Sequence, residues 1–109
     1  MSINCIRALI EKAAVTCPDK VAIIDGAKKL TYSELFRKVN QIARYLSELS
    51  LPSGSRIGIY SHKSSEQIIA ILALLSTEYI FVPISRLLKP EQVEHIINDC
   101  GIACIITDK

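Results

Sequence analysis

The stretch RIGIYSHKSSEQIIAILALLSTEYIFVPI, residues 56–84, contains the pattern that decides the fold. It begins with a short apolar strand over 56–60, and the polar run 64–67 then caps a helix whose body, 68–75, is apolar on almost every side. A second strand is predicted over 79–84, where Pro83 suits a strand end or an edge strand. Strand, buried helix and strand in this order are typical of a right-handed crossover between parallel strands.

The C-terminal residues continue this alternation. Pro90 opens another helix at its first position, Glu91 complements the helix dipole, and Gly101 ends the helix. The run 102–107 is apolar almost throughout, as expected of a strand that is covered on both faces. The sequence therefore predicts an α/β fold with a mostly parallel sheet flanked by helices. The inner face of the last helix is predicted to comprise Val93, Ile96, Ile97 and Cys100.

The N-terminal residues predict a helix followed by a short hairpin. Apolar side chains recur at helical spacing and stop before Pro18, which disfavours helical geometry in the residue before it. Two short apolar stretches, 20–24 and 29–32, flank an Asp-Gly pair at 25–26, the pattern of a β-hairpin. The residues that define the helical stripe are Ile3, Ile6, Ile10 and Ala13.

A long amphipathic helix is predicted directly after the hairpin. Thr31 and Glu34 have the spacing of a capping box, in which each side chain satisfies an orphan amide of the first helical turn. Apolar residues then recur at steps of three and four, so one stripe of the helix should face the core. That stripe consists of Leu35, Val39, Ile42, Leu46 and Leu49.

Composition limits the class of protein. The chain has 109 residues, of which 50% are hydrophobic and 22% are charged, so we expect one small globular domain over 1–109. Its net charge is +2 and its basic residues are scattered, so nothing indicates binding to nucleic acid. The longest apolar run, 68–75, is far too short to cross a bilayer, and no integral membrane segment is expected.

The four cysteines predict reduced thiols in a cytoplasmic protein, because no signal-peptide pattern follows Met1. Cys100 and Cys104 are four residues apart, but no other cysteine or histidine stands at zinc-finger spacing. We therefore interpret the cysteines as small buried apolar side chains rather than metal ligands. The other two are Cys5 and Cys17.

Few residues stand out as candidates for chemistry. His62 follows a predicted strand that ends where α/β proteins place their ligands, although a solvated loop histidine would give the same pattern. His95 is expected on the surface of the last helix, and Asp25 is interpreted as a turn former. The glycines are isolated, so neither a P-loop nor a dinucleotide fingerprint is present. They are Gly26, Gly54, Gly58 and Gly101.

Several motifs nevertheless carry a family resemblance. The run 30–35, LTYSEL, resembles the first core motif of the AMP-forming adenylating synthetases, which include acyl-CoA synthetases, firefly luciferase and the adenylation domains of nonribosomal peptide synthetases. The run 54–59 resembles the Gly-Asp-Arg-Val strand of that family, and 81–84 resembles its second core motif. The similarity continues in order along essentially the whole chain. The amino-acid sequence of 87–93 is similar to that of the acyl-CoA ligases within the family.

The resemblance implies the N-terminal subdomain of an adenylate-forming enzyme. Members use ATP and magnesium to convert a carboxylic acid into an acyl-adenylate, and then pass the acyl group to a thiol. The residues that do this lie beyond position 109 in the family order, so we assign no catalytic, cofactor-binding or metal-binding residue and expect no cofactor for this chain alone. The chain departs from the second motif at Glu78, where glycine is usual, and at Ser85-Arg86, which replace an Asp or Asn followed by proline.

The expected function is therefore that of a structural part. We predict a subdomain of an ATP-dependent carboxylic acid ligase, of the acyl-CoA synthetase type, that is inactive alone and has the remainder of the parent enzyme as its partner. A stand-alone α/β module that complements or regulates a partner is the alternative, and a small nucleotide-binding protein is disfavoured by the missing glycine loop. Apolar surface that a full enzyme would cover predicts self-association.

Overall fold

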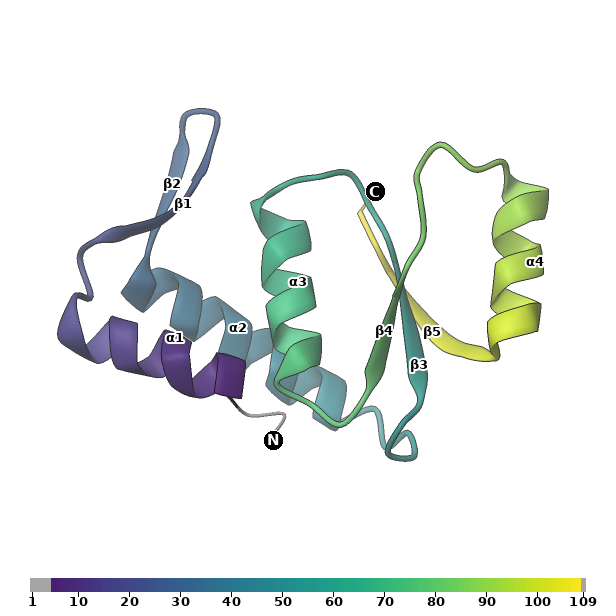
Figure 1. Ribbon diagram of the computed structural model, residues 1–109, viewed down its shortest axis with the longest axis horizontal. Coiled ribbons are helices and arrows are strands. Elements are labelled where there is room, and N and C mark those ends of the chain that lie inside the picture. The colour runs from purple at the N-terminus through teal and green to yellow at the C-terminus, as the bar shows by residue number, and fades with distance from the viewer. Residues whose placement is uncertain (1–4, 109) are drawn as a thin grey trace.

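The structure, a computed structural model that describes residues 5–108, is a succession of layers (Figure 1). At one end, helices α1 (Cys5–Thr16) and α2 (Tyr32–Ser47) lie beside a hairpin of β1 (Val21–Asp25) and β2 (Lys28–Thr31). Helix α3 (Ser65–Leu75) separates them from a sheet of β3 (Arg56–Tyr60), β4 (Ile80–Pro83) and β5 (Ile102–Thr107). Helix α4 (Pro90–Cys100) lies on the other side of that sheet.

The three-stranded sheet confirms the predicted parallel α/β architecture. Its strand order is β4-β3-β5, and β3 pairs in parallel with both neighbours. In the register of the sheet, Ile57 of β3 lies opposite Phe81 of β4 and Cys104 of β5. Pro83 is on β4, an edge strand, as its missing N–H predicts.

The last predicted strand forms as β5, from the apolar run 102–107. Cys104 and Ile106 pack against the core cluster, and α4 lies on the other side of the sheet. None of the six residues of β5 is buried, so its two faces are covered less completely than its apolar sequence predicted. Within residues 5–108, β5 is the second edge of the sheet and pairs with β3 alone.

The N-terminal elements follow the sequence closely. Glu34 and Thr31 form the predicted capping box: the Thr31 hydroxyl accepts the Glu34 N–H at 3.2 Å, and a Glu34 carboxylate oxygen accepts the Thr31 N–H at 2.9 Å. That second hydrogen bond is the main reason why the pKa of Glu34 is lowered from its usual value. The hairpin forms across Gly26, whose φ of 62° suits glycine. Ile3, in the predicted stripe of the first helix, lies outside the described residues.

The core lies between α2, α3 and the sheet. Val39, Leu74 and Ile57 come from these three layers, and each has 0% of its surface exposed. Two positions expected to be inside are not: Ile42 is 38% exposed and Ile68 is 42% exposed. In each of these two helices, the apolar face is wider than the part that the neighbouring elements cover. Helical spacing alone therefore overestimates burial here.

Candidate functional site at the carboxyl edge of the sheet

The carboxyl ends of the three parallel strands meet at one edge of the sheet, where open α/β folds bind ligands. Ser61 and His62 follow β3, Arg86 follows β4, and Asp108 follows β5. Residues that are far apart in the sequence therefore become neighbours because the strands are parallel and adjacent. This edge is the best candidate for a functional site in the described chain.

His62 is held at this edge by Asp108. One Asp108 carboxylate oxygen, Oδ2, accepts the backbone N–H of His62 at 2.8 Å and lies 2.9 Å from the ring Nδ1. The backbone hydrogen bond, followed by the ring contact, lowers the pKa of Asp108 from its usual value. The histidine singled out by the sequence is thus at the strand edge, paired with a carboxylate that sequence reasoning did not single out.

The pair does not form a nucleophilic triad. The hydroxyl of Ser64 donates to the backbone carbonyl of His62 at 3.3 Å, and not to its ring. The hydroxyl of Ser61 is buried without a hydrogen-bond partner among the described residues. Among the described residues, no serine hydroxyl is therefore hydrogen-bonded to the ring of His62, as a triad would require.

Unsatisfied polar atoms gather at this edge. Within residues 5–108, the buried side-chain atoms that have no hydrogen-bond partner are Ser61 Oγ, Arg86 Nε and Asp108 Oδ1. The guanidinium carbon of Arg86 lies 4.7 Å from the centroid of the Tyr60 ring, so the side chain is stacked on an aromatic face. Because buried polar groups in folded proteins are almost always paired, this concentration of unpaired atoms at one edge needs an explanation.

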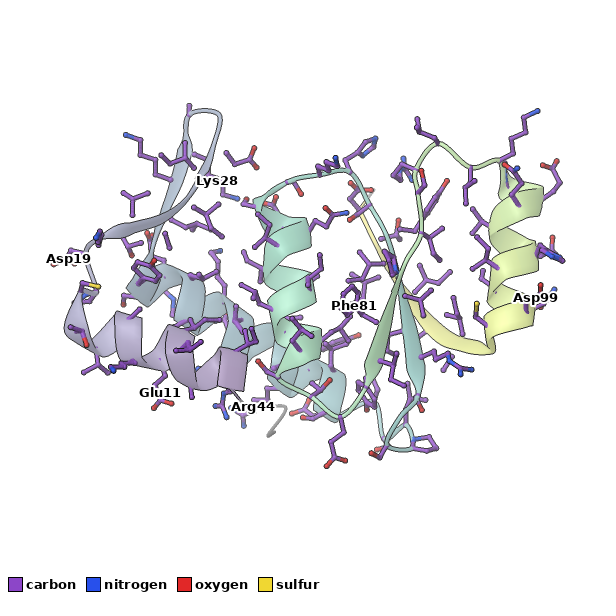
Figure 2. The ribbon with its side chains drawn as sticks, in the orientation of Figure 1. Glu11, Asp19, Lys28, Arg44, Phe81 and Asp99 are labelled. Carbon is purple, nitrogen blue, oxygen red and sulfur yellow. The ribbon has the colours of Figure 1, made fainter. Side chains whose placement is uncertain are left out.

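A hollow of about 640 Å³ adjoins these residues. Its wall includes Phe81, which extends from β4 toward α3 in Figure 2, together with Ile59 and Ile71. His62, Lys63 and Arg86 supply its ionisable groups, and no carboxylate lines it. The hollow therefore offers hydrogen-bond donors beside an apolar wall.

The described residues do not fit a magnesium site. They contain no group of three or more His, Cys, Asp or Glu side chains placed to hold a metal ion. Cys17, Cys100 and Cys104 are free and half-buried. No helix in the described part of the chain is long and apolar enough to span a bilayer.

A second polar contact joins the hairpin to the start of α3. Asp25 Oδ2 accepts the backbone N–H of Ser65 at 2.9 Å, so this residue caps a helix in addition to ending a strand at the turn. Lys28 pairs with Glu66, and this ammonium group lowers the pKa of Glu66 to about 2. Sequence spacing carries no signal for these contacts, because the partners are about forty residues apart and meet only in the fold.

The remaining candidates have structural roles. His95 Nε2 lies 3.0 Å from Asp99 Oδ2 one helical turn away, and its side chain is 74% exposed, so its surface position is confirmed. Glu78 lines an open hollow of about 670 Å³ beside α1 and α2. Among the described residues, Ser50 is the non-glycine residue with positive φ, so the backbone at Glu78 does not require glycine.

Similarity to known proteins identifies the family of the chain. The model of the family described as "AMP-binding enzyme" matches residues 10–109. The chain belongs to the AMP-binding enzyme family. Tyrocidine synthase 1 of Brevibacillus parabrevis is 38% identical over 104 residues, which are 95% of this chain and 10% of that protein. Zwittermicin A synthase ZmaJ of Bacillus cereus is 35% identical over 106 residues, 97% of this chain and 20% of that protein.

Solved structures show which part of the family's fold this chain resembles. The N-terminal subdomain of Klebsiella oxytoca NpsA, in complex with 3-hydroxyanthranilyl-AMSN, superposes with a TM-score of 0.84 at 25% identity, covering 94% of this chain and 26% of that one. An artificially fused adenylation–PCP di-domain NRPS, NpsA-ThdA from the same organism, superposes with a TM-score of 0.86 at 25% identity, covering 95% and 20%. This AMP-binding enzyme chain therefore has the fold of part of the N-terminal subdomain of adenylation enzymes, as the sequence motifs predicted.

Proposed function

We propose that this chain is the first structural part of an adenylation domain of the nonribosomal peptide synthetase type, which activates a carboxylic acid with ATP. The family match over residues 10–109 carries the proposal. The choice of peptide synthetase over the acyl-CoA synthetase type is supported by the relatives, tyrocidine synthase 1 and an NRPS di-domain among them. A cytoplasmic location, expected from the reduced thiols, belongs to the same proposal.

We further propose that the chain is inactive alone. Adenylation requires charge neutralisation around the transferring phosphate by backbone amides, magnesium and a fixed cation. The described residues hold neither a metal-binding cluster nor a serine hydroxyl hydrogen-bonded to the ring of His62. The chain spans 26% of the NpsA subdomain, so about three quarters of a relative's N-terminal subdomain has no counterpart in this chain.

The test is amino-acid-dependent exchange of pyrophosphate into ATP, measured on two proteins. The 109-residue chain should show no exchange above background with any amino acid. A chimera in which this chain replaces the matched residues of the tyrocidine synthase 1 adenylation domain should recover exchange with the amino acid that the parent domain activates. Exchange by the chain alone would contradict the second proposal, and a folded but inactive chimera would contradict the first.

A further inference from the structure

The hollow of about 640 Å³ at the carboxyl edge contains hydrogen-bond donors that have no partner. Arg86 and Ser61 line it, and Arg86 Nε and Ser61 Oγ are buried without hydrogen-bond partners among residues 5–108. A guanidinium group can only donate hydrogen bonds, and a serine hydroxyl can donate as well as accept. Lys63 lines the same hollow, and its ammonium group is also donor-only. The partner that these groups lack is therefore a hydrogen-bond acceptor.

The charges around the hollow favour an acceptor that is negatively charged. Lys63 and Arg86 are positive, and no Asp or Glu side chain lines the hollow. The ion pairs formed within the described part of the chain include neither of these two residues. Asp108 lies outside the lining, and its Oδ2 is already bound to the backbone and ring of His62. Because hydrogen bonds to charged groups are stronger than neutral ones, an anion would stabilise these donors best.

The stacking of Arg86 favours a planar anion. Its guanidinium carbon lies 4.7 Å from the centroid of the Tyr60 ring, so the aromatic ring covers one face of the group. The N–H donors of a guanidinium lie in its plane and point outward from its edge. A carboxylate fits this edge with two parallel hydrogen bonds. The geometry of Arg86 therefore suits a carboxylate.

The rest of the hollow favours a carboxylate that is attached to an apolar group. Ile59, Ile71 and Phe81 form part of the wall. Leu87, which follows Arg86 and also lines the hollow, is 94% exposed. An apolar group in the hollow would cover this side chain and remove its surface from water, which is favourable. Inorganic phosphate has no apolar part and would leave the wall and Leu87 uncovered.

We propose that this hollow is a binding site for a carboxylate carried on an apolar group, with Arg86 and Ser61 as its hydrogen-bond donors. Lys63 contributes positive charge, and Leu87 covers the apolar part of the ligand. The site goes beyond the proposed function, because its ligand is distinct from the acid that the enzyme would activate. Two sources supply the same chemistry: a free small acid, or an Asp or Glu side chain elsewhere in the complete protein.

Titration of the 15N-labelled 109-residue chain with acetate, butyrate and inorganic phosphate tests the site by NMR at constant pH and ionic strength. Butyrate should cause saturable shifts of the Arg86 Nε–H signal and of the backbone amides of 85–87. It should bind at least about threefold more tightly than acetate, because burial of each CH2 group favours binding by up to about fourfold. No saturation, equal affinities for the two acids, or tighter binding of phosphate than of butyrate would overturn the proposal.

Variants of Arg86 show whether this side chain binds the carboxylate. Arg86→Gln should weaken butyrate binding at least about fivefold. Arg86→Lys keeps the charge but lacks the planar edge, so it should weaken binding at least about threefold, and it keeps the test valid if Arg86→Gln does not fold. Arg44→Gln is the matched control on α2, where the side chain is 85% exposed, and should leave the affinity unchanged. Unchanged affinity in a folded Arg86 variant would refute the proposal.

The chimera with the tyrocidine synthase 1 adenylation domain distinguishes the two sources of the carboxylate. If a free acid is the ligand, butyrate should shift the Arg86 Nε–H signal of the chimera as it does in the 109-residue chain. If an internal Asp or Glu fills the hollow, butyrate should cause no shift, and Arg86→Gln should lower the urea midpoint more in the chimera than in the chain. Loss of butyrate binding without this added destabilisation would count against the site. Pyrophosphate exchange by the same chimera tests the proposed function separately.

Discussion

Replacing Asp25 with alanine should uncouple the hairpin from α3. Asp25 Oδ2 accepts the N–H of Ser65, one of the first-turn amides that a helix cannot satisfy from within. The hydroxyl of Ser64 caps a different amide, that of Gln67, at 3.2 Å. No second acceptor for the Ser65 N–H is present among the described residues, so its hydrogen bond would be lost outright.

The expected loss of stability follows from the nature of this contact. Removing a helix N-terminal acceptor costs about 0.5–2 kcal/mol, and a hydrogen bond to a charged group contributes about 1.5–3 kcal/mol. The contact is partly buried, so we expect a loss in the overlap of these ranges, about 1.5–2 kcal/mol. For a domain of this size, such a loss lowers Tm by roughly 6–16 °C.

Urea unfolding followed by far-ultraviolet circular dichroism measures this loss. The midpoint should fall while the m-value stays constant, because the surface exposed on unfolding does not change. Asp25→Asn retains an oxygen acceptor and should cost less than Asp25→Ala. Asp99→Ala removes a carboxylate that is 64% exposed on α4, labelled in Figure 2, and should stay within about 0.5 kcal/mol of wild type. Equal effects of Asp25→Ala and Asp99→Ala would refute the capping role.

Two further predictions concern the core and pH. Leu74→Ala should lower the free energy of unfolding in urea by about 3–5 kcal/mol because Leu74 is fully buried. Leu87→Ala, at a position that is 94% exposed, should lower it by less than about 0.5 kcal/mol. Similar losses for both variants would contradict the assignment of the core. Hydrogen bonds from Lys28 above all, and from the Glu66 backbone N–H and the Ser65 hydroxyl, lower the folded-state pKa of Glu66 from 4.5 to about 2. These contacts therefore stabilise the fold fully above about pH 4.5 and lose this effect as pH falls toward 2. Glu66→Gln should therefore make the urea midpoint fall less steeply over that interval, and an unaltered pH profile would show that these contacts contribute nothing.

Local signals were sufficient to predict most of the fold. The capping box at Thr31 and Glu34, the turn at Gly26 and the helix end at Gly101 each depend on neighbouring residues, and the structure has all three. The periodicity of 56–84 likewise predicted the parallel crossover, because strand and helix patterns differ in period. These features need no knowledge of distant residues.

What the sequence did not reveal depends on contacts between distant segments. Local spacing indicates only a turn former at Asp25, and the hydrogen bond of this residue to Ser65 arises only when the hairpin meets α3. The pairing of His62 with Asp108 requires β3 and β5 to be neighbours, which local spacing does not specify. Strand β5 shows the same limit: its apolar sequence predicted a strand covered on both faces, but it could not specify that β5 pairs with β3 at an edge of the sheet formed by the described residues.

The position of β3 in the middle of the sheet has a consequence for synthesis on the ribosome. The helices and hairpin of residues 5–47 contact one another over short sequence separations, so they can assemble while the rest of the chain is still being made. Strand β3 is made next but gains its second partner only when β5 emerges, since Ile57 pairs with Cys104. We therefore expect nascent β3 to be a binding site for chaperones during the time that α4 is translated.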